Sequence, residues 1–479
     1  MSHIRVIGGG LAGCEAAWQA ASRGVRVTLH EMRPVRQTAV HRTGDLAELV
    51  CSNSLRADKL DNAVGLLKEE MRRLGSLVMR AAAATRVPAG AALAVDRGRF
   101  AAFITREIEQ HPLITVVRGE IDDIPVPRGP SEPVILATGP LTSARLAERI
   151  AACVGQDSLY FYDAISPIVL AESIDMSRVF RASRWGRSLG SRPAGDSSEG
   201  PPRAADDDEG DYLNCPMTAA EYESFYDALV GAQKASVHDL DRETFFEGCL
   251  PIEVLAHRGR DTLRFGPMKP VGLDDPRTGR RPYAVVQLRQ DNLAGDHYSL
   301  VGFQTQLAWG EQSRVLRMIP GLERAEFVRF GMVHRNTYIN GPTVLRETWQ
   351  TRAREDLFFA GQISGVEGYV ESAASGLLAG INATALATGG ELRAMPRTTA
   401  MGALAYYVSH AAATGYQPSN ITFGIMEPLA DHPGRRDARR RAMAERALRD
   451  LDHWVVGGRT EDRRQKTEDR RTEAVGGRQ

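Results

Sequence analysis

The sequence predicts an α/β protein in which a parallel-sheet domain is discontinuous and contains a second, inserted α+β domain. Three observations predict this arrangement. Residues 4–29 follow the order strand, glycine turn, helix, strand, which is the start of a parallel sheet. Further apolar strands return at 133–137 and 356–360, far apart in the chain. The 479 residues, 43% hydrophobic and 25% charged, are enough for two or three globular domains.

Local signals place the first elements. Residues 4–7 are apolar and predict a strand, and an alanine-rich helix follows from about Gly13 to Arg23. Gly24 ends this helix, and residues 25–29 predict the second strand. The whole unit has the length of a nucleotide-binding strand–helix–strand unit, about 30 residues.

The turn between the first strand and the helix has the pattern G-x-G-x-x-G. Its first glycine permits a tight turn, its second lets a pyrophosphate approach the backbone, and its third lets helix and strand pack closely. Glu31 ends the second strand, where a carboxylate can accept both ribose hydroxyls. A plain glycine turn is the alternative, but the two strands, the helix and the acid favour dinucleotide binding. The predicted contacts are Gly8, Gly9, Gly10, Leu11, Ala12, Gly13 and Glu31.

Two later segments favour FAD over NAD as the dinucleotide. The strand at 356–360 runs into a turn that resembles the second flavin-contacting segment of FAD oxidoreductases, and residues 137–139 resemble a strand end of the same proteins. A second G-x-G-x-x-G is missing from the sequence, so NADH or NADPH would bind only transiently. We therefore predict a Rossmann-like FAD-binding domain, with further cofactor contacts from Gly361, Gln362 and Ile363.

The domain boundaries follow from where these segments return to one sheet. Residues 1–144 are predicted to be the first part of the FAD-binding domain, and 341–456 its second part with a C-terminal helix. Residues 145–340 would form the inserted substrate domain. Two polar segments are predicted to be disordered, an insertion at 186–211 and a tail at 457–479.

Composition excludes several classes of protein. Sixty basic and sixty acidic residues give zero formal net charge, so any nucleic-acid contact must use local basic patches. The sequence has no apolar run of the roughly 18 residues that a membrane span needs and no signal-peptide pattern, so we expect a cytoplasmic protein without a membrane partner. Five cysteines without metal-ligand spacing predict neither a disulfide framework nor a metal site.

Two cysteines lie in settings that suit a reactive thiol. Cys51 precedes a polar Ser-Asn-Ser turn. Cys249 follows Gly248 and comes two residues before Pro251, so we expect it in a loop or at the end of an element. Each is also compatible with a small packing residue. Cys14 and Cys153 are predicted to be packing residues, and Cys215 stays undecided.

Several segments together identify a family. The sequence resembles the folate- and FAD-dependent tRNA uracil-5-methyltransferases, the TrmFO family, over about residues 1–455. The insertion and the tail depart from the family pattern, and neither touches a matching motif. The matching segments are 8–13, Val50–Arg56, Tyr212–Met217, Phe246–Glu253, Leu263–Pro270, Gln287–Asn292, Val301–Gln306 and Met332–Thr337.

The resemblance implies a reaction and its participants. 5,10-Methylenetetrahydrofolate would donate a carbon to C5 of a T-loop uridine in tRNA, FAD would carry reducing equivalents, and NADH or NADPH would be the reductant. By the family pattern Cys249 is the nucleophile and Cys51 the acid/base group, although the sequence itself does not distinguish the two roles. The tRNA T-arm and folate are the implied partners, with no obligate protein partner evident.

Basic residues are candidates for RNA backbone contacts, although each is more often a solvated surface charge. His334 would orient folate or base, or be a buried core histidine. Other readings of the sequence are the related wobble-uridine flavoprotein, a general FAD oxidoreductase, and a tRNA-binding factor with structural FAD. The basic candidates are Arg314, Arg317, Arg324, Arg329, Arg335 and the cluster 435–441.

Overall fold

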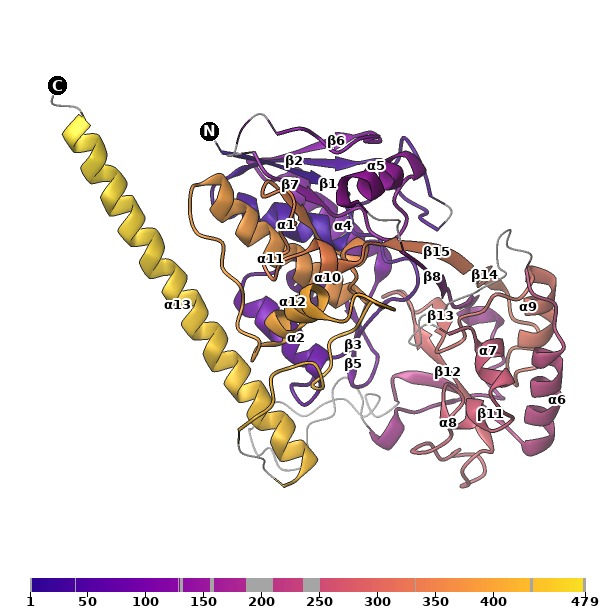
Figure 1. Cartoon of the computed structure of the whole chain (residues 1–479). Coiled ribbons are helices and arrows are strands. Elements are labelled where there is room, and N and C mark those ends of the chain that lie inside the picture. Colours follow the sequence, from indigo (N-terminus) through magenta and orange to yellow (C-terminus); the bar gives the residue numbers. More distant parts are fainter. Residues whose placement is uncertain are drawn as a thin grey trace.

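The computed structural model has an α/β body and an α+β body joined by a two-stranded ribbon, with a long helix at the C-terminal end (Figure 1). No helix among the described residues has both the length and the apolar character to cross a membrane. The structure describes residues 2–38, 40–127, 129, 132–155, 159–186, 210–235, 250–331, 333–430 and 434–476.

The first domain is built on a parallel sheet of five strands in the order β16-β7-β1-β2-β6. Strands β1, β7 and β16 are short and bury their apolar residues, as expected of a sheet covered on both faces, whereas the edge strand β6 buries only Ile114. The return of the late strand β16 beside β7 confirms the predicted discontinuous Rossmann-like domain. The strands are β1 (His3–Ile7), β2 (Arg26–Glu31), β6 (Ile114–Arg118), β7 (Val134–Leu136) and β16 (Leu357–Phe359).

Helices α1 (Leu11–Ala21) and α11 (Tyr369–Ala387) cross in close contact against this sheet. A Cβ atom at Gly376 would lie 2.1 Å from the carbonyl oxygen of Ala12, so the crossing depends on small residues. Other elements complete the domain: α2 (Ala63–Arg73), α3 (Leu77–Ala84), α4 (Arg97–Glu109), α5 (Ala144–Val154), α10 (Gly341–Val344), α12 (Ala400–His410), and the small sheet of β3 (Ser54–Ala57), β5 (Ala92–Val95) and β4 (Arg86–Val87).

The inserted domain has its own antiparallel sheet of six strands, in the order β10-β11-β12-β13-β9-β14, and its own apolar core. Mixed helices and antiparallel strands agree with the predicted α+β class. The strands are β9 (Ile168–Leu170), β10 (Phe180–Arg181), β11 (Tyr212–Met217), β12 (Ala284–Gln290), β13 (His297–Leu300) and β14 (Phe327–Arg329). The helices are α6 (Ala219–Val230), α7 (Ile252–His257), α8 (Thr262–Phe265) and α9 (Trp309–Leu316).

The two domains are connected by β8 (Leu159–Ala164) and β15 (Val333–Tyr338), which pair antiparallel. Helix α5 precedes this ribbon and buries Leu146 and Ile150 in the core of the first domain. The chain therefore leaves the first domain at β8, later than the predicted residue 145. The sequence shows that α5 is amphipathic, but not which of two cores its apolar face covers.

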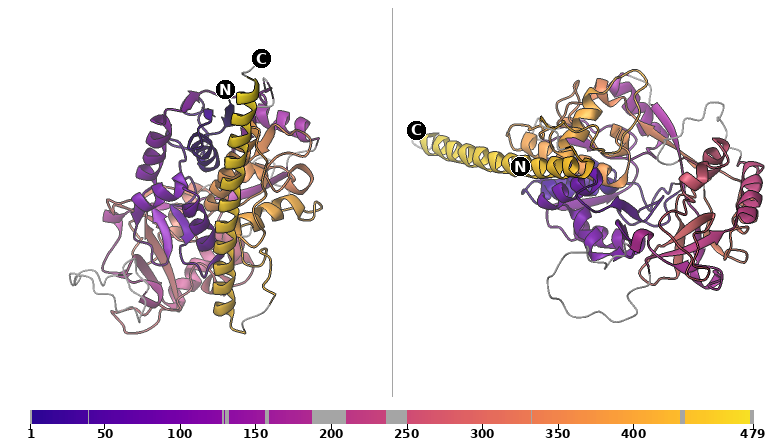
Figure 2. Two further views of the ribbon diagram at one scale, coloured as in Figure 1. Left: turned by 90° about the vertical axis from the view of Figure 1, so that its left-hand side faces the viewer. Right: turned by 90° about the horizontal axis from the view of Figure 1, so that it is seen from below.

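The C-terminal region differs from the prediction. Helix α13 runs without interruption over Arg436–Gly476, where we expected disorder from residue 457 (Figure 2). Its first half buries Met443, Ala447 and Leu451 against the first domain. The tail sequence is rich in Arg and Glu, which are strong helix formers, with acidic and basic residues three and four positions apart. Of the predicted disordered insertion, residues 187–209 lie outside the described residues.

Candidate active site

The glycine turn between β1 and α1 forms an open backbone cradle. Gly8 has φ +105°, and a Cβ atom there would lie 2.4 Å from the carbonyl oxygen of Ala137, so only glycine fits. At Gly13 a Cβ atom would lie 1.8 Å from the carbonyl oxygen of Gly8. Gly10 differs, because no atom lies within 4 Å of its Cβ position. This free space beside the start of α1 suits the pyrophosphate of a dinucleotide.

Glu31 stands at the end of β2 beside this turn. Its Oε2 accepts the Gly9 N–H at 2.8 Å, and its Oε1 accepts the Arg33 Nε–H at 2.8 Å. Burial alone raises the pKa of Glu31, but the hydrogen bonds and charge of Arg33 outweigh it and hold this pKa below its usual value. The side chain is therefore a carboxylate, and Oε2 has a second lone pair that can accept a ribose hydroxyl.

The second predicted cofactor segment lies against the first. Gly361 follows β16 with φ +78°, and its N–H donates to Ser375 Oγ at 2.7 Å. A Cβ atom at Gly361 would lie 3.0 Å from the Cβ of Ala12, so the two glycine turns are neighbours. Ile363 is buried, and Gln362 Nε2 donates to Glu367 Oε2 at 2.7 Å. The fold thus brings together all the residues predicted to bind the cofactor.

Cys51 docks on the first residue of α11. The hydroxyl oxygen of Tyr369 accepts the Cys51 N–H at 2.8 Å, the Cys51 Sγ–H at 2.9 Å and the Ser52 N–H at 3.3 Å. Burial and the adjacent Cys51 raise the pKa of Tyr369 well above its usual value. The phenol therefore stays protonated and holds the thiol at a fixed position.

Two arginines from different elements hold the backbone before Cys51. Arg97 Nη1 donates to the carbonyl oxygen of Val50 at 3.2 Å, and Arg329 Nη1 donates to the same oxygen at 2.9 Å. Arg97 also pairs with Asp291 at 3.0 Å. Burial and the nearby Arg97 charge lower the pKa of Arg329 to about 10, a value at which it stays charged at neutral pH. Arg329 was predicted to contact RNA, but its guanidinium points into this loop.

A third arginine holds the residues after Cys51. Arg289, on β12 of the inserted domain, is buried and donates to Ser52 Oγ at 2.9 Å and to Asn53 Oδ1 at 2.8 Å. The loop of residues 50–53, the cysteine-bearing loop, therefore lies at the junction of the two domains. The guanidinium groups of Arg97, Arg289 and Arg329 and the carboxylate of Asp291 surround it. Thiolates are stabilised by such an electropositive setting.

The remaining cysteines divide as follows. Cys14 and Cys215 are fully buried, and burial raises the pKa of each thiol far above its usual value, as expected of packing residues. Cys153 is partly buried and packs against the core of the first domain. Cys249 lies outside the described residues, so its predicted role stays a prediction.

The other basic candidates have varied surroundings. Arg314 pairs with Glu311 on its own helix, and Arg317 donates to the carbonyl oxygen of Ala325. Arg324 is exposed. The side chains of His334 and Arg335 lie outside the described part of the structure.

Sequence reasoning missed Tyr369, Arg97 and Arg289. Tyr369 had a usable signal, since it directly follows a glycine at the start of the cofactor-proximal helix. Arg289 lies in the family-matching segment Gln287–Asn292, but Arg97 had no such signal, and only the fold brings either side chain to the Cys51 loop.

Two buried ionic groups, Glu371 and Lys68, contact the segment that follows the cysteine-bearing loop. Glu371, in the first turn of α11, pairs with Arg56 and accepts the Ile421 N–H at 3.0 Å. Lys68 is fully buried and donates through Nζ to the carbonyl oxygens of Arg56 and Ala57. Burial lowers the pKa of Lys68 from 10.5 to about 7.

This lowered pKa predicts a pH dependence of stability. Between pH 7 and 10.5 the unfolded chain binds a proton on Lys68 that the folded chain lacks, so the Lys68 contribution to stability rises with pH in this window. We expect the free energy of unfolding of the wild type, relative to Lys68→Met, to rise from pH 7 to pH 10 in urea titrations. Lys59→Met, at an exposed position, is the matched control and should run parallel to the wild type. Parallel curves for Lys68→Met would contradict the prediction.

Fold and site together define a protein of the α/β FAD-binding class with a cysteine-bearing loop between two domains. Residues 3–391 match the family profile described as glucose inhibited division protein A (GidA). The methylenetetrahydrofolate–tRNA-(uracil-5-)-methyltransferase TrmFO of Symbiobacterium thermophilum is 58% identical over 459 residues, which cover 95% of this chain and 97% of that protein. The TrmFO of Geobacter sulfurreducens is 55% identical over 453 residues, covering 95% and 99%. The chain belongs to the TrmFO family of GidA-related proteins.

Solved structures agree on the fold. Aquifex aeolicus GidA, in its form I crystal, superposes with a TM-score of 0.65 at 19% identity, covering 94% of this chain and 76% of that one. Its form II crystal gives a TM-score of 0.64 at 17% identity. At this identity the likeness supports the shared architecture alone.

Proposed function

We propose that this protein transfers the carbon of 5,10-methylenetetrahydrofolate to C5 of a T-loop uridine in tRNA, forming 5-methyluridine, with FAD as cofactor and NADH or NADPH as reductant. The observation that carries the proposal is the whole-chain identity of 54–58% to TrmFO proteins. The cysteine-bearing loop between the two domains supports it. A cytoplasmic location and action without an obligate protein partner are part of the same proposal.

The residues present fit FAD. The free space at Gly10, the carboxylate of Glu31 and the neighbouring turn at Gly361 would hold its pyrophosphate and ribose. When bound, FAD supplies reducing equivalents for the new methyl group.

The thiols of Cys249 and Cys51 suit the two tasks that methylation of uracil C5 requires. Uracil C5 is a poor nucleophile, and addition of the Cys249 thiolate to C6 makes it nucleophilic toward an electrophilic methylene carbon. Cys51 Sγ then accepts the C5 proton while the bond between the methylene carbon and its donor breaks, which leaves an exocyclic methylene on C5. A hydride equivalent from the reductant would convert this methylene to a methyl group, and departure of the Cys249 thiolate from C6 restores the C5–C6 double bond. Arg97, Arg289 and Arg329 favour the thiolate form of Cys51 that this proton transfer needs.

The related wobble-uridine flavoprotein is the nearest alternative. The TrmFO proteins are 54–58% identical over 95% of this chain. Identity of this level over nearly the whole chain favours uracil C5 methylation over the wobble reaction.

The proposal is tested by incubating the purified protein with unmodified tRNA transcript, NADPH and methylene-labelled tetrahydrofolate. Label in T-loop 5-methyluridine is the expected result, and S-adenosylmethionine in place of folate should give none. A yellow protein that transfers no label from folate would refute the proposed function. Binding of tRNA without turnover would instead support the binding-factor reading.

The variant Tyr369→Phe tests whether the Tyr369 hydroxyl positions the cysteine-bearing loop. The change removes the hydroxyl oxygen that accepts the Cys51 N–H and Sγ–H. Because misplacing a reacting group by about 1 Å can cost 10²-fold, we expect methylation to slow by roughly tenfold or more, with FAD content unchanged.

Tyr226→Phe is the matched control, because its hydroxyl donates to Ala256 within the inserted domain, away from the loop. Single-turnover rates and the rate of Cys51 alkylation, followed by mass spectrometry, measure the effect. Equal rates for Tyr369→Phe and Tyr226→Phe would show that the Tyr369 hydroxyl does not position Cys51.

A further inference from the structure

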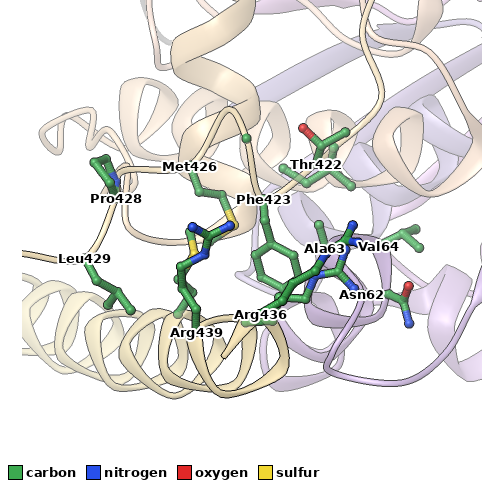
Figure 3. Close-up of a pocket in the computed structure, with 14 residues that line it drawn as sticks. Asn62, Ala63, Val64, Thr422, Phe423, Met426, Pro428, Leu429, Arg436 and Arg439 are labelled. Atoms are coloured by element: carbon green, nitrogen blue, oxygen red, sulfur yellow. The ribbon is translucent and has the colours of Figure 1, made fainter. Parts of the chain in front are cut away.

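A cleft of about 640 Å³ opens beside the start of α13, apart from the predicted cofactor residues. Its walls are the segment 421–429, the first turn of α2 and the first two turns of α13. Figure 3 shows Arg436 and Arg439 projecting from α13 into the cleft, toward the segment that carries Phe423 and Met426. Nothing in the proposed chemistry uses this cleft.

The rim of the cleft is strongly basic. Arg436, Arg439 and Arg440 occupy positions i, i+3 and i+4, so their side chains share one face of α13. Residues 435–441 contain five arginines and one aspartate, an excess of four positive charges in a chain whose net charge is zero. Within the part of the chain that the structure describes, none of these three arginines forms an ion pair.

The floor of the cleft is apolar. Met426 and Met443 are buried beneath it, and the half-buried ring of Phe423 lines its wall. The Arg440 guanidinium lies 5.9 Å from the centre of the Phe423 ring. Unpaired guanidinium groups beside an aromatic ring are the combination that binds phosphates and stacks a base or sugar of single-stranded or loop RNA.

One end of the cleft contacts the start of helix α11. Ile421, at one end of the cleft, donates its N–H to Glu371 Oε1 at 3.0 Å. Glu371 lies two residues after Tyr369, whose hydroxyl oxygen accepts the Cys51 Sγ–H.

We propose that this cleft binds the sugar-phosphate chain of the tRNA substrate, with phosphates on Arg436, Arg439 and Arg440 and a base or ribose against Phe423. The proposal rests on the proposed function for the identity of the RNA. The basic rim and the long polyanionic substrate of the proposed function favour RNA over an acidic peptide.

The test is tRNA binding by the FAD-loaded full-length protein. The double variant Arg436→Gln/Arg439→Gln is compared with Arg435→Gln/Arg441→Gln, which removes the same charge from α13 at positions that do not line the cleft. The Kd for unmodified tRNA transcript is measured by filter binding at several salt concentrations. Methylation is measured separately at saturating tRNA.

We expect the cleft variant to raise Kd about tenfold and to reduce the salt slope by roughly 1.4–1.8, since each lost phosphate contact removes about 0.7–0.9. The control should change Kd less than threefold, and flavin absorbance should be equal in both. Equal Kd values for cleft variant and wild type, or equal weakening by both variants, would overturn the proposal. Wild-type protein that binds tRNA but does not methylate it would refute the proposed function and leave this comparison valid.

Discussion

Replacing Cys249 by alanine is expected to abolish 5-methyluridine formation while leaving FAD bound. The expected loss is complete because no other group would add to uracil C6, and without that addition C5 does not attack the methylene carbon. The predicted cofactor contacts lie in other segments of the chain, so flavin absorbance should be unchanged. Labelled 5-methyluridine, measured by nucleoside chromatography, gives the readout.

Cys51→Ala should behave differently if Cys51 is the acid/base group. Loss of a positioned acid or base slows a reaction by about 10²–10⁴-fold, and the Cys249 thiolate could still add to the ring. Cys51→Ala should therefore accumulate a covalent protein–tRNA complex on denaturing gels, whereas Cys249→Ala should form none. The reverse pattern would exchange the two roles, and full activity of either variant would remove that cysteine from the mechanism. Cys153→Ala, at a partly buried position, is the control and should be fully active.

The parts of the site that were predictable are those with local signals. The turn at Gly8–Gly13 and the acid at Glu31 follow from spacing within one strand–helix–strand unit, and the structure confirms the local geometry. Gly361 was predictable because a strand, a glycine and a small-residue helix follow one another. Their contact with FAD stays a prediction.

The surroundings of Cys51 were not predictable, for a physical reason. Arg97 comes from a helix of the first domain, while Arg289 and Arg329 come from two strands of the inserted domain. Each arginine alone looks like a solvated surface charge, and only tertiary packing turns it inward. The same limit applies to α5, because its sequence does not indicate which of the two domain cores its apolar face packs against.

Gly13→Ala is expected to damage both the fold and cofactor binding. The added methyl group would lie 1.8 Å from the carbonyl oxygen of Gly8, and backbone atoms cannot give way without moving α1 from β1. Overpacking that forces the backbone to shift typically costs about 1–3 kcal/mol. We expect a lower melting temperature for the apoprotein and a preparation that is largely colourless.

The variant Gly10→Ala distinguishes an effect on FAD binding from an effect on the fold at the same turn. Gly10 has φ −77°, which any residue adopts, and no protein atom lies within 4 Å of its Cβ position. The apoprotein should therefore melt at the wild-type temperature, while the methyl group intrudes into the space predicted for the pyrophosphate and weakens FAD binding in a flavin titration. If Gly10→Ala binds FAD as tightly as the wild type, the pyrophosphate does not lie in this cradle, and the predicted cofactor contacts at Gly8–Gly13 would be wrong even though the fold is right.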